Sequence, residues 1–195
     1  RRPTPRGSGR RPGRRQPMNA RKVSYLGVLV ALAVSLNILE SMIPTPLPWV
    51  RLGLANLLAL VAILTSGWKE GFIVTVMRIL ISSLLFGGFL SPAFLLSLGG
   101  GLAGTAVMAL MAPGAWRFYS PLAMSVAGAF FHGTVQVLVL RLVLVRTWEV
   151  LYLLPWVLFP ALLSGVATGV LANLLHMRRR ELFELLSGKV EVTGA

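Results

Sequence analysis

Residues 23–43 read VSYLGVLVALAVSLNILESMI, a long apolar run whose acidic residue, Glu40, stands near its end. A helix needs roughly 20 apolar residues to cross the hydrocarbon core of a bilayer, and this run has that length. Further apolar segments follow at residues 51–66, 71–89, 93–112, 119–145 and 150–176. The sequence therefore predicts an all-α integral membrane protein, a bundle of six transmembrane helices.

The composition agrees with a lipid environment. Of the 195 residues, 55% are hydrophobic and only 13% are charged, whereas soluble domains have about 25% charged residues. The chain has no cysteine, which excludes disulfides, thiolate metal sites and cysteine nucleophiles. It also has no aspartate, because all six acidic residues are glutamates.

The basic residues indicate the orientation of the chain. The formal net charge is +13, and nine of the nineteen lysines and arginines lie in the first 22 residues. With six spans and an inner N-terminus, the outer segments hold only Arg51, Arg141 and Arg146. This positive-inside bias predicts cytoplasmic termini and a multi-pass protein of the plasma membrane. Nucleic acid is not an expected partner, because no aromatic residue is interleaved with the basic run.

The two ends of the chain differ from its apolar centre. Residues 1–19 are rich in Arg, Pro and Gly without apolar periodicity, so we expect a disordered basic tail. Met18 resembles a natural start, which would make residues 1–17 an upstream extension, and no signal-peptide cleavage site follows an apolar core there. The transmembrane domain is expected over residues 20–177 and a cytoplasmic tail over residues 178–195.

A proline-rich stretch, IPTPLPWVRLGLAN at residues 43–56, connects the first two spans. Its alternating prolines favour extended, polyproline-like backbone. Trp49 is expected at the membrane interface. Arg51 and Asn56 flank the start of the second span, on the outer side where a solute would arrive. We therefore predict an outer hairpin that acts as a gate.

Glu40 and Arg78 are charged residues within the predicted spans, where burial is costly unless they face the bundle, water or a ligand. Glu40 could reach headgroup water, or it could contact a ligand or pair with Arg51 as part of the gate. Arg78 could extend back to the cytoplasmic surface. Alternatively, it could point into the bundle with Thr75 and Ser82, which share its helix face, and meet an anionic substrate or backbone carbonyls.

The fifth span carries a polar stripe. Ser125, Gly128, His132 and Gln136 recur at three- or four-residue spacing, so they share one helix face and could line a cavity. A lone histidine could instead bond a neighbouring helix. A metal site is not expected, because glutamine is a poor ligand and no second histidine or carboxylate joins the pair. Asn56 and Ser97 complete the hydrogen-bonding candidates.

Small residues form stripes that allow helices to approach closely. In the sixth span, Ala161, Gly165, Gly169 and Asn173 predict packing inside the bundle. In the first span, Gly27, Ala31 and Ser35 could instead face a separate membrane partner. The segment LGGGLAG at residues 98–104 allows close approach of neighbouring helices or of a ligand to the backbone.

Three segments carry a resemblance to a known family: IPTPLPWVRLGLANLLAL (43–60), MRILISSLLFGGFLSPAFLLSLGGG (77–101) and GAFFHGTVQ (128–136). They resemble the Gx transporter family, also catalogued as heptaprenyl diphosphate synthase component I. That family is similar to the substrate-binding S components of energy-coupling factor (ECF) transporters. The family pattern has an asparagine after the histidine, whereas this chain has Gly133. The hydrogen-bonding contact that the resemblance implies for that asparagine is therefore in doubt here.

The resemblance implies an S-component-like six-helix fold whose first outer loop closes over a ligand. It also implies that Gly27, Ala31 and Ser35 dock a transmembrane coupling subunit, with ATP hydrolysis on separate subunits. The chain itself has no phosphate-loop motif. The enzymatic family name conflicts with the composition, because prenyl diphosphate elongation needs acidic clusters that hold magnesium, and the spans have neither aspartate nor paired glutamates.

The first functional hypothesis is therefore a substrate-binding component of an ECF-type transporter. It would capture a small anionic or vitamin-like solute from outside and require no cofactor. The expected substrate-binding residues are Glu40, Arg51, Asn56, Arg78, Ser97, His132 and Gln136. The alternative is a non-catalytic membrane subunit in polyprenyl diphosphate or quinone synthesis, which anchors a soluble synthase. An intramembrane enzyme that uses His132 lacks a nucleophile or carboxylate partner nearby in the sequence.

Overall fold

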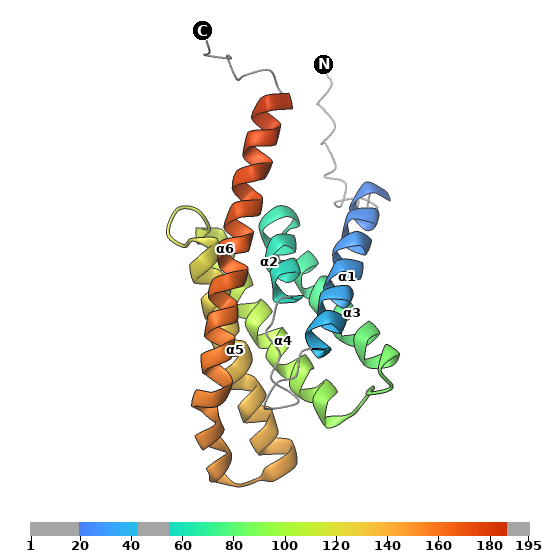
Figure 1. Cartoon of the computed structure of the whole chain (residues 1–195), viewed down its shortest axis with the longest axis vertical. Coiled ribbons are helices and arrows are strands. Elements are labelled where there is room, and N and C mark those ends of the chain that lie inside the picture. Colours follow the sequence, from blue (N-terminus) through green and yellow to red (C-terminus); the bar gives the residue numbers. More distant parts are fainter. Residues whose placement is uncertain (1–19, 43–54, 187–195) are drawn as a thin grey trace, which may run out of the picture.

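The computed structural model describes residues 20–42 and 55–186. Over these residues the chain is all-α, with six α-helices and short 3-10 and π segments (Figure 1). The α-helices are α1 (Ala20–Ser41), α2 (Ala55–Ser66), α3 (Trp68–Leu85), α4 (Pro92–Met111), α5 (Pro121–Val139) and α6 (Leu154–Leu186). Trp49 and Arg51, with the rest of the expected outer hairpin before Ala55, lie outside the described residues.

Each predicted span corresponds to a helix. Four segments are long and apolar enough to cross a membrane: Lys22–Ser41, Pro92–Gly114, Pro121–Val145 and Trp148–Leu175. The described part of α2 forms a shorter apolar helix, Asn56–Ser66. The all-α fold and the membrane character are thus confirmed. Six complete crossings and the side on which the termini lie stay predictions.

The sixth helix is longer than expected. It continues through Leu186, so the first residues of the segment expected as a cytoplasmic tail are helical. The sequence from Met177 to Leu186 contains no Gly or Pro and is rich in Arg, Glu and Leu, which favour a helix. Pro160 lies inside α6, a position that membrane helices tolerate because neighbouring groups satisfy the freed backbone.

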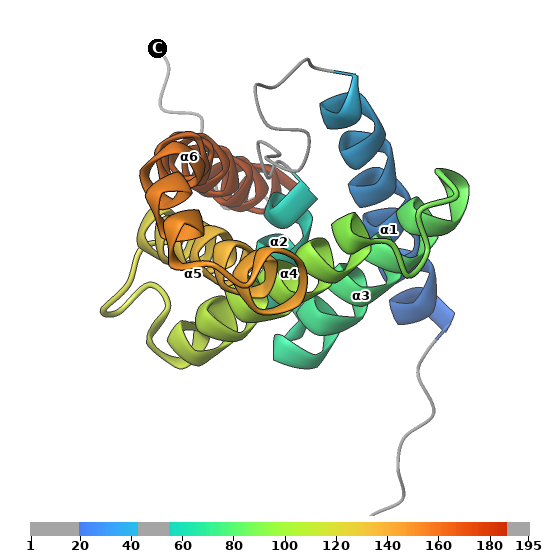
Figure 2. The same ribbon diagram turned by 90° about the horizontal axis from the view of Figure 1, so that it is seen from below.

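The helices alternate in direction along the chain. Figure 1 shows the N-terminal end of α1 and the C-terminal end of α6 at the same end of the molecule. Seen from below, α5 and α6 lie on one side, α1 and α3 on the other, and α2 and α4 between them (Figure 2). The helix α2 contacts all five other α-helices. Its apolar side chains therefore form the centre of the core, with Leu60 and Ala62 fully buried.

Glycines set the separation of α5 and α6. A Cβ atom on Gly169 would lie 2.6 Å from the Cα of Leu122, and one on Gly165 would lie 2.9 Å from the Cβ of Ala129. Both distances are shorter than carbon contacts allow, so only glycine fits. The predicted packing role of these two glycines is confirmed. Asn173, expected to join them between helices, is exposed, so that part of the prediction was wrong.

Exposed aromatic residues gather at both ends of the bundle, as in the interfacial belts of membrane proteins. At the end that holds the N-terminus of α1, the exposed aromatic side chains include Trp68, Trp116, Phe118 and Tyr119. At the opposite end they include Trp148, Tyr152 and Trp156, and Arg141 stacks on the ring of Trp148 at 3.5 Å. The two belts fit a bundle that lies across a bilayer.

An ion pair joins α1 to the start of α3. The ammonium group of Lys22 contacts the carboxylate of Glu70, which is largely buried, just before the predicted third span. The hydrogen bond from Lys22 is the main reason that the pKa of Glu70 is lowered below its ordinary value. This pair holds the charged ends of two apolar helices together.

We expect the Lys22–Glu70 pair to make stability depend on pH. Because the pKa of Glu70 is lower in the folded state, its stabilisation is present above the unfolded-state pKa and is lost as the pH falls through the folded-state pKa. Thermal unfolding of purified protein between about pH 6 and pH 3 should show this loss in the wild type and a flatter profile in Glu70→Gln. Parallel profiles would contradict the role of the pair.

Candidate functional site

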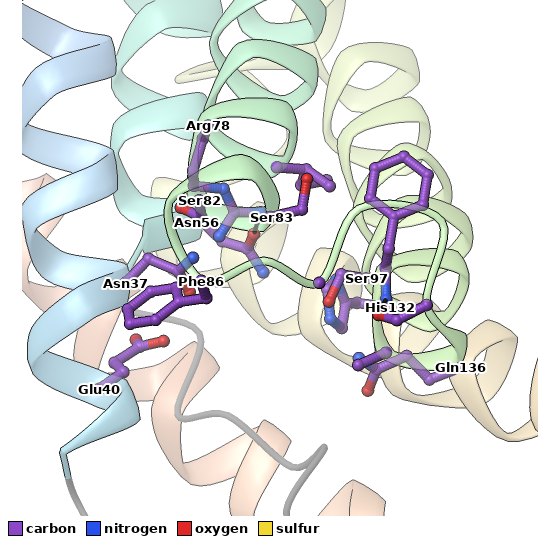
Figure 3. A pocket seen from close by; sticks show the side chains of 15 residues that line it. Asn37, Glu40, Asn56, Arg78, Ser82, Ser83, Phe86, Ser97, His132 and Gln136 are labelled. Atoms are coloured by element: carbon purple, nitrogen blue, oxygen red, sulfur yellow. Dashed lines mark hydrogen bonds between the residues drawn. The ribbon is translucent and has the colours of Figure 1, made fainter.

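A cavity of about 150 Å³ lies between five helices, toward the end of the bundle opposite the N-terminus of α1. The second halves of α1, α3 and α5 meet there with the starts of α2 and α4, because the helices alternate in direction. Figure 3 shows the side chains that line it. Six of the seven predicted substrate-binding residues are among them: Glu40, Asn56, Arg78, Ser97, His132 and Gln136. The seventh, Arg51, lies outside the described residues.

Arg78 is held inside the bundle. Its side chain is 6% exposed, and its Nη2 donates a hydrogen bond to Oδ1 of Asn56 at 3.2 Å. The alternative, in which Arg78 extends to the cytoplasmic surface, is therefore wrong for this structure. Arg78 therefore brings a guanidinium, a group with five N–H donors, to the wall of the cavity.

The polar residues that were predicted to share one face of α3 contact different parts of the structure. The hydroxyl of Thr75 is bonded to that of Thr105 on α4 at 2.7 Å, away from the cavity. Ser82, one turn after Arg78, lines the cavity and is 4% exposed. Its hydroxyl has no hydrogen-bond partner among the described residues. A buried polar atom of this kind carries a desolvation cost unless another group bonds it.

Glu40 lines the cavity from the side of α1. It is 4% exposed, so its carboxylate does not lie at an exposed helix end as the headgroup interpretation required. Asn37, one turn earlier on the same face, is buried and lines the cavity too. The ligand-contact interpretation of Glu40 fits this position, and pairing with Arg51 stays a prediction.

The stripe on α5 is only partly a cavity wall. His132 and Gln136 line the cavity, but Ser125 bonds Thr168 of α6 at 2.6 Å. A Cβ on Gly128 would meet Met108 of α4 at 2.8 Å. The expectation of one continuous lining was therefore wrong for Ser125 and Gly128, because α6 and α4 close over their part of α5.

Gly133 does not face the cavity. A Cβ built on it would meet Leu158 and Val157 at 3.2 and 3.4 Å, so this position points toward α6. Even a longer polar side chain at this position would start from the α5–α6 interface. The departure from the family pattern thus leaves the described cavity lining unchanged.

The glycine segment of α4 brings the two walls of the cavity together. A Cβ on Gly100 would lie 2.7 Å from Cγ of Gln136 and 2.9 Å from the carbonyl oxygen of His132. A Cβ on Gly101 would lie 3.7 Å from Nη2 of Arg78 and closer still to Ile79. Of the two predicted roles for this segment, close helix approach is confirmed. It places the arginine of α3 and the histidine of α5 on adjacent faces of α4.

Several lining residues were not predicted as site residues: Asn37, Ile79, Ser82, Ser83, Phe86, Gly88, Ser91, Ala93 and Phe94. Asn37 carried a usable signal, because it shares a helix face with Glu40. Ser91 caps α4 by accepting a hydrogen bond from the backbone of Phe94 at 3.3 Å. Serines at helix ends commonly have this local role, so the sequence did not distinguish Ser91 from an ordinary cap.

Two helix N-termini face the cavity. The first turn of α2 contributes Asn56, and the first turns of α4 contribute Ala93, Phe94 and Ser97. A helix N-terminus carries a partial positive charge and favours anions. Together with Arg78 these termini make this part of the cavity electropositive, whereas Glu40 makes the α1 side electronegative. Among the described residues there is no group of three His, Cys, Asp or Glu that could hold a metal ion.

The predicted partner stripe on α1 lies on the surface. Gly27, Ala31 and Ser35 are all exposed, and a Cβ on Gly27 would have no atom within 4 Å. The hydroxyl of Ser35 bonds the carbonyl of Ala31 at 3.0 Å. The stripe therefore takes no part in packing within the described chain.

The family model for heptaprenyl diphosphate synthase component I matches residues 29–175. The chain belongs to this family. The match includes α2 to α5 and all the helical residues that line the cavity. No curated protein and no solved structure matches the chain significantly.

Proposed function

We propose that this family member is the membrane-embedded substrate-binding component of an ECF-type transporter. It captures a small polar solute from the outer side of the membrane, with both termini in the cytoplasm and six helices across the bilayer. The observation that carries this proposal is the polar cavity, lined by Arg78, Glu40 and His132 from three different helices. Ionisable groups buried in a membrane bundle commonly mark a solute pathway.

The position of the cavity supports uptake from outside. It lies toward the end opposite the N-terminus of α1, and the positive-inside bias assigns that N-terminal end to the cytoplasm. Lys22, Lys69 and Arg117 lie toward the proposed inner end, and Arg141 and Arg146 toward the outer end. The proline-rich segment before α2, expected as an outer hairpin, adjoins the cavity-lining Asn56 in sequence, as a gate would.

The size of the cavity supports a small solute. An apolar cavity of about 150 Å³ in another protein accommodates benzene. A cavity of similar volume suits a compact ligand and not a heptaprenyl chain. Energy would come from partner subunits, and the exposed stripe of Gly27, Ala31 and Ser35 supplies a surface for a coupling subunit.

The proposal predicts that purified protein retains or binds a small solute. Mass spectrometry of protein released from detergent should detect a small molecule in the wild type and little or none in His132→Ala. Thr134→Val is the matched control, because Thr134 bonds the carbonyl of Phe130 and does not line the cavity. Equal retention of the solute by all three proteins would contradict the site.

The family description favours a second candidate, a membrane component of a prenyl diphosphate synthase. In this role the chain would anchor a soluble synthase through the basic residues of its inner end and would not catalyse the reaction. Affinity capture from native membranes distinguishes the two. Recovery of a prenyl synthase, with loss of long-chain product on deletion of this chain, would favour the second candidate over transport.

A further inference from the structure

The polar groups of the cavity form two separate clusters on different helices. Arg78 and Ser82 stand one turn apart on α3, and His132 and Gln136 stand one turn apart on α5. Figure 3 shows the α3 pair in the middle of the cavity wall and the α5 pair to the right, beside Ser97. Gly100 and Gly101 of α4 lie against the two clusters and hold them close together.

Each cluster contains one buried polar atom that a ligand could bond. The hydroxyl of Ser82 and Nδ1 of His132 are buried and have no hydrogen-bond partner among the described residues. Ser83, the neighbour of Ser82, also lines the cavity, but its hydroxyl already donates to the carbonyl of Leu80 at 2.8 Å. The difference indicates that Ser82 and His132 are the groups available to a ligand.

We propose that the ligand is a small monocarboxylate with a second hydrogen-bonding group, held at two points. The inference rests on the proposed function and specifies its substrate class. The carboxylate is bound by the guanidinium of Arg78 and the hydroxyl of Ser82. The second group bonds Nδ1 of His132 or the amide of Gln136, each of which can donate or accept a hydrogen bond depending on its tautomer or orientation.

Charge and geometry favour a carboxylate over a phosphate. Arginine presents a planar fork that matches a carboxylate at two atoms. A phosphate ester carries about 1.5 to 2 negative charges at neutral pH, and a diphosphate carries more. The described lining supplies one arginine, and Glu40 contributes the opposite charge in the same cavity. A single negative charge near Arg78 therefore suits the cavity better than a diphosphate.

The number of polar groups favours a second contact. Most side chains of this lining can form hydrogen bonds, and the polar groups of a small-molecule site fix the orientation of its ligand. An apolar acid would leave Nδ1 of His132 without a bond in a desolvated wall and would offer nothing to the amide of Gln136, at a cost to its affinity. A second polar group on the ligand removes that cost.

The test compares four probes on the detergent-solubilised full chain by isothermal titration calorimetry. Pyridine-3-carboxylate has both groups, benzoate lacks the ring nitrogen, pyridine-3-carboxamide lacks the charge, and inorganic phosphate has no second group. We expect pyridine-3-carboxylate to bind about tenfold more tightly than benzoate and at least about tenfold more tightly than the amide, because each lost bond to a buried group costs roughly 1–3 kcal/mol. Phosphate should bind most weakly.

Two matched substitutions locate the carboxylate. Ser82→Ala should weaken binding of pyridine-3-carboxylate and benzoate about tenfold, whereas Thr134→Val, which lies outside the cavity lining, should change neither more than about twofold. Equal binding of the amide or phosphate, or equal effects of the two substitutions, would overturn the two-point carboxylate site while leaving solute capture intact. Absence of binding by every probe, with no co-purified small molecule, would overturn the proposed function itself.

Discussion

Replacing Arg78 by alanine should weaken binding of a carboxylate probe about 100-fold, because truncating one partner of a buried charged pair costs roughly 2–5 kcal/mol. The buried guanidinium is the cation that α3 presents to the cavity, and it donates to Asn56 at 3.2 Å. Its removal takes away the charge and the planar fork together. Calorimetric titration of pyridine-3-carboxylate measures the loss.

Arg78→Lys separates the charge from the geometry. Lysine keeps the positive charge but lacks the planar fork of arginine. We therefore expect Arg78→Lys to bind the carboxylate about tenfold more weakly than the wild type, an affinity between those of the wild type and Arg78→Ala. Arg117→Ala, an exposed arginine at the other end of the bundle, should leave affinity unchanged. Thermal unfolding without ligand shows whether the variants remain folded. Wild-type affinity in folded Arg78→Ala would contradict the assignment of the anion to this residue.

The helices and the core of the site could be predicted because lipid imposes simple rules. A span must be long and apolar, and this rule placed α1, α3 and α4 within a few residues of their observed bounds. A charged side chain in a span must face the bundle, water or a ligand. That rule selected Glu40 and Arg78, which line the same cavity although they are far apart in sequence.

Residue spacing could not predict which residues on one face of a helix line the cavity and which pack against a neighbouring helix. Ser125 and Gln136 share a face of α5, yet Ser125 bonds Thr168 while Gln136 lines the cavity. The neighbours of a helix change along its length because helices cross at an angle, and no local pattern records that angle. Phe86 and Gly88 were not predicted to line the cavity for a related reason. The turn after α3 lies beside the cavity only in the assembled bundle.

The glycines of α4 connect the packing of the bundle to the chemistry of the site. A larger residue at Gly101 would press on Ile79 and Thr75 of α3, and one at Gly100 would press on α5. The separation between Arg78 and His132 is therefore determined by the helix between them. A ligand that bonds both clusters must match this separation, so packing and specificity depend on the same residues.

Gly100→Ala should consequently damage stability and binding together. The added Cβ would lie 2.9 Å from the carbonyl oxygen of His132, which is backbone and can move only if α4 and α5 separate. Overpacking of this kind costs about 1–3 kcal/mol, only partly offset by the gain of about 1 kcal/mol from replacing a helical glycine by alanine. We expect a lower unfolding temperature and a loss of roughly tenfold or more in affinity for pyridine-3-carboxylate, because the His132 cluster shifts relative to Arg78.

Neighbouring glycines supply the controls for this prediction. At Gly99 the nearest atom is Cγ2 of Val139 at 2.9 Å, the end of a side chain that can rotate, so Gly99→Ala should have a milder effect. Gly27→Ala on the open face of α1, with no atom within 4 Å, should leave affinity near its wild-type value and raise stability by up to about 1 kcal/mol. If Gly100→Ala behaves like Gly27→Ala, the close contact of α4 with α5 does not position the site. If Gly100→Ala unfolds the protein, Gly99→Ala remains as a milder test. It adds a weaker steric contact between α4 and α5, and a smaller loss of affinity for pyridine-3-carboxylate should result.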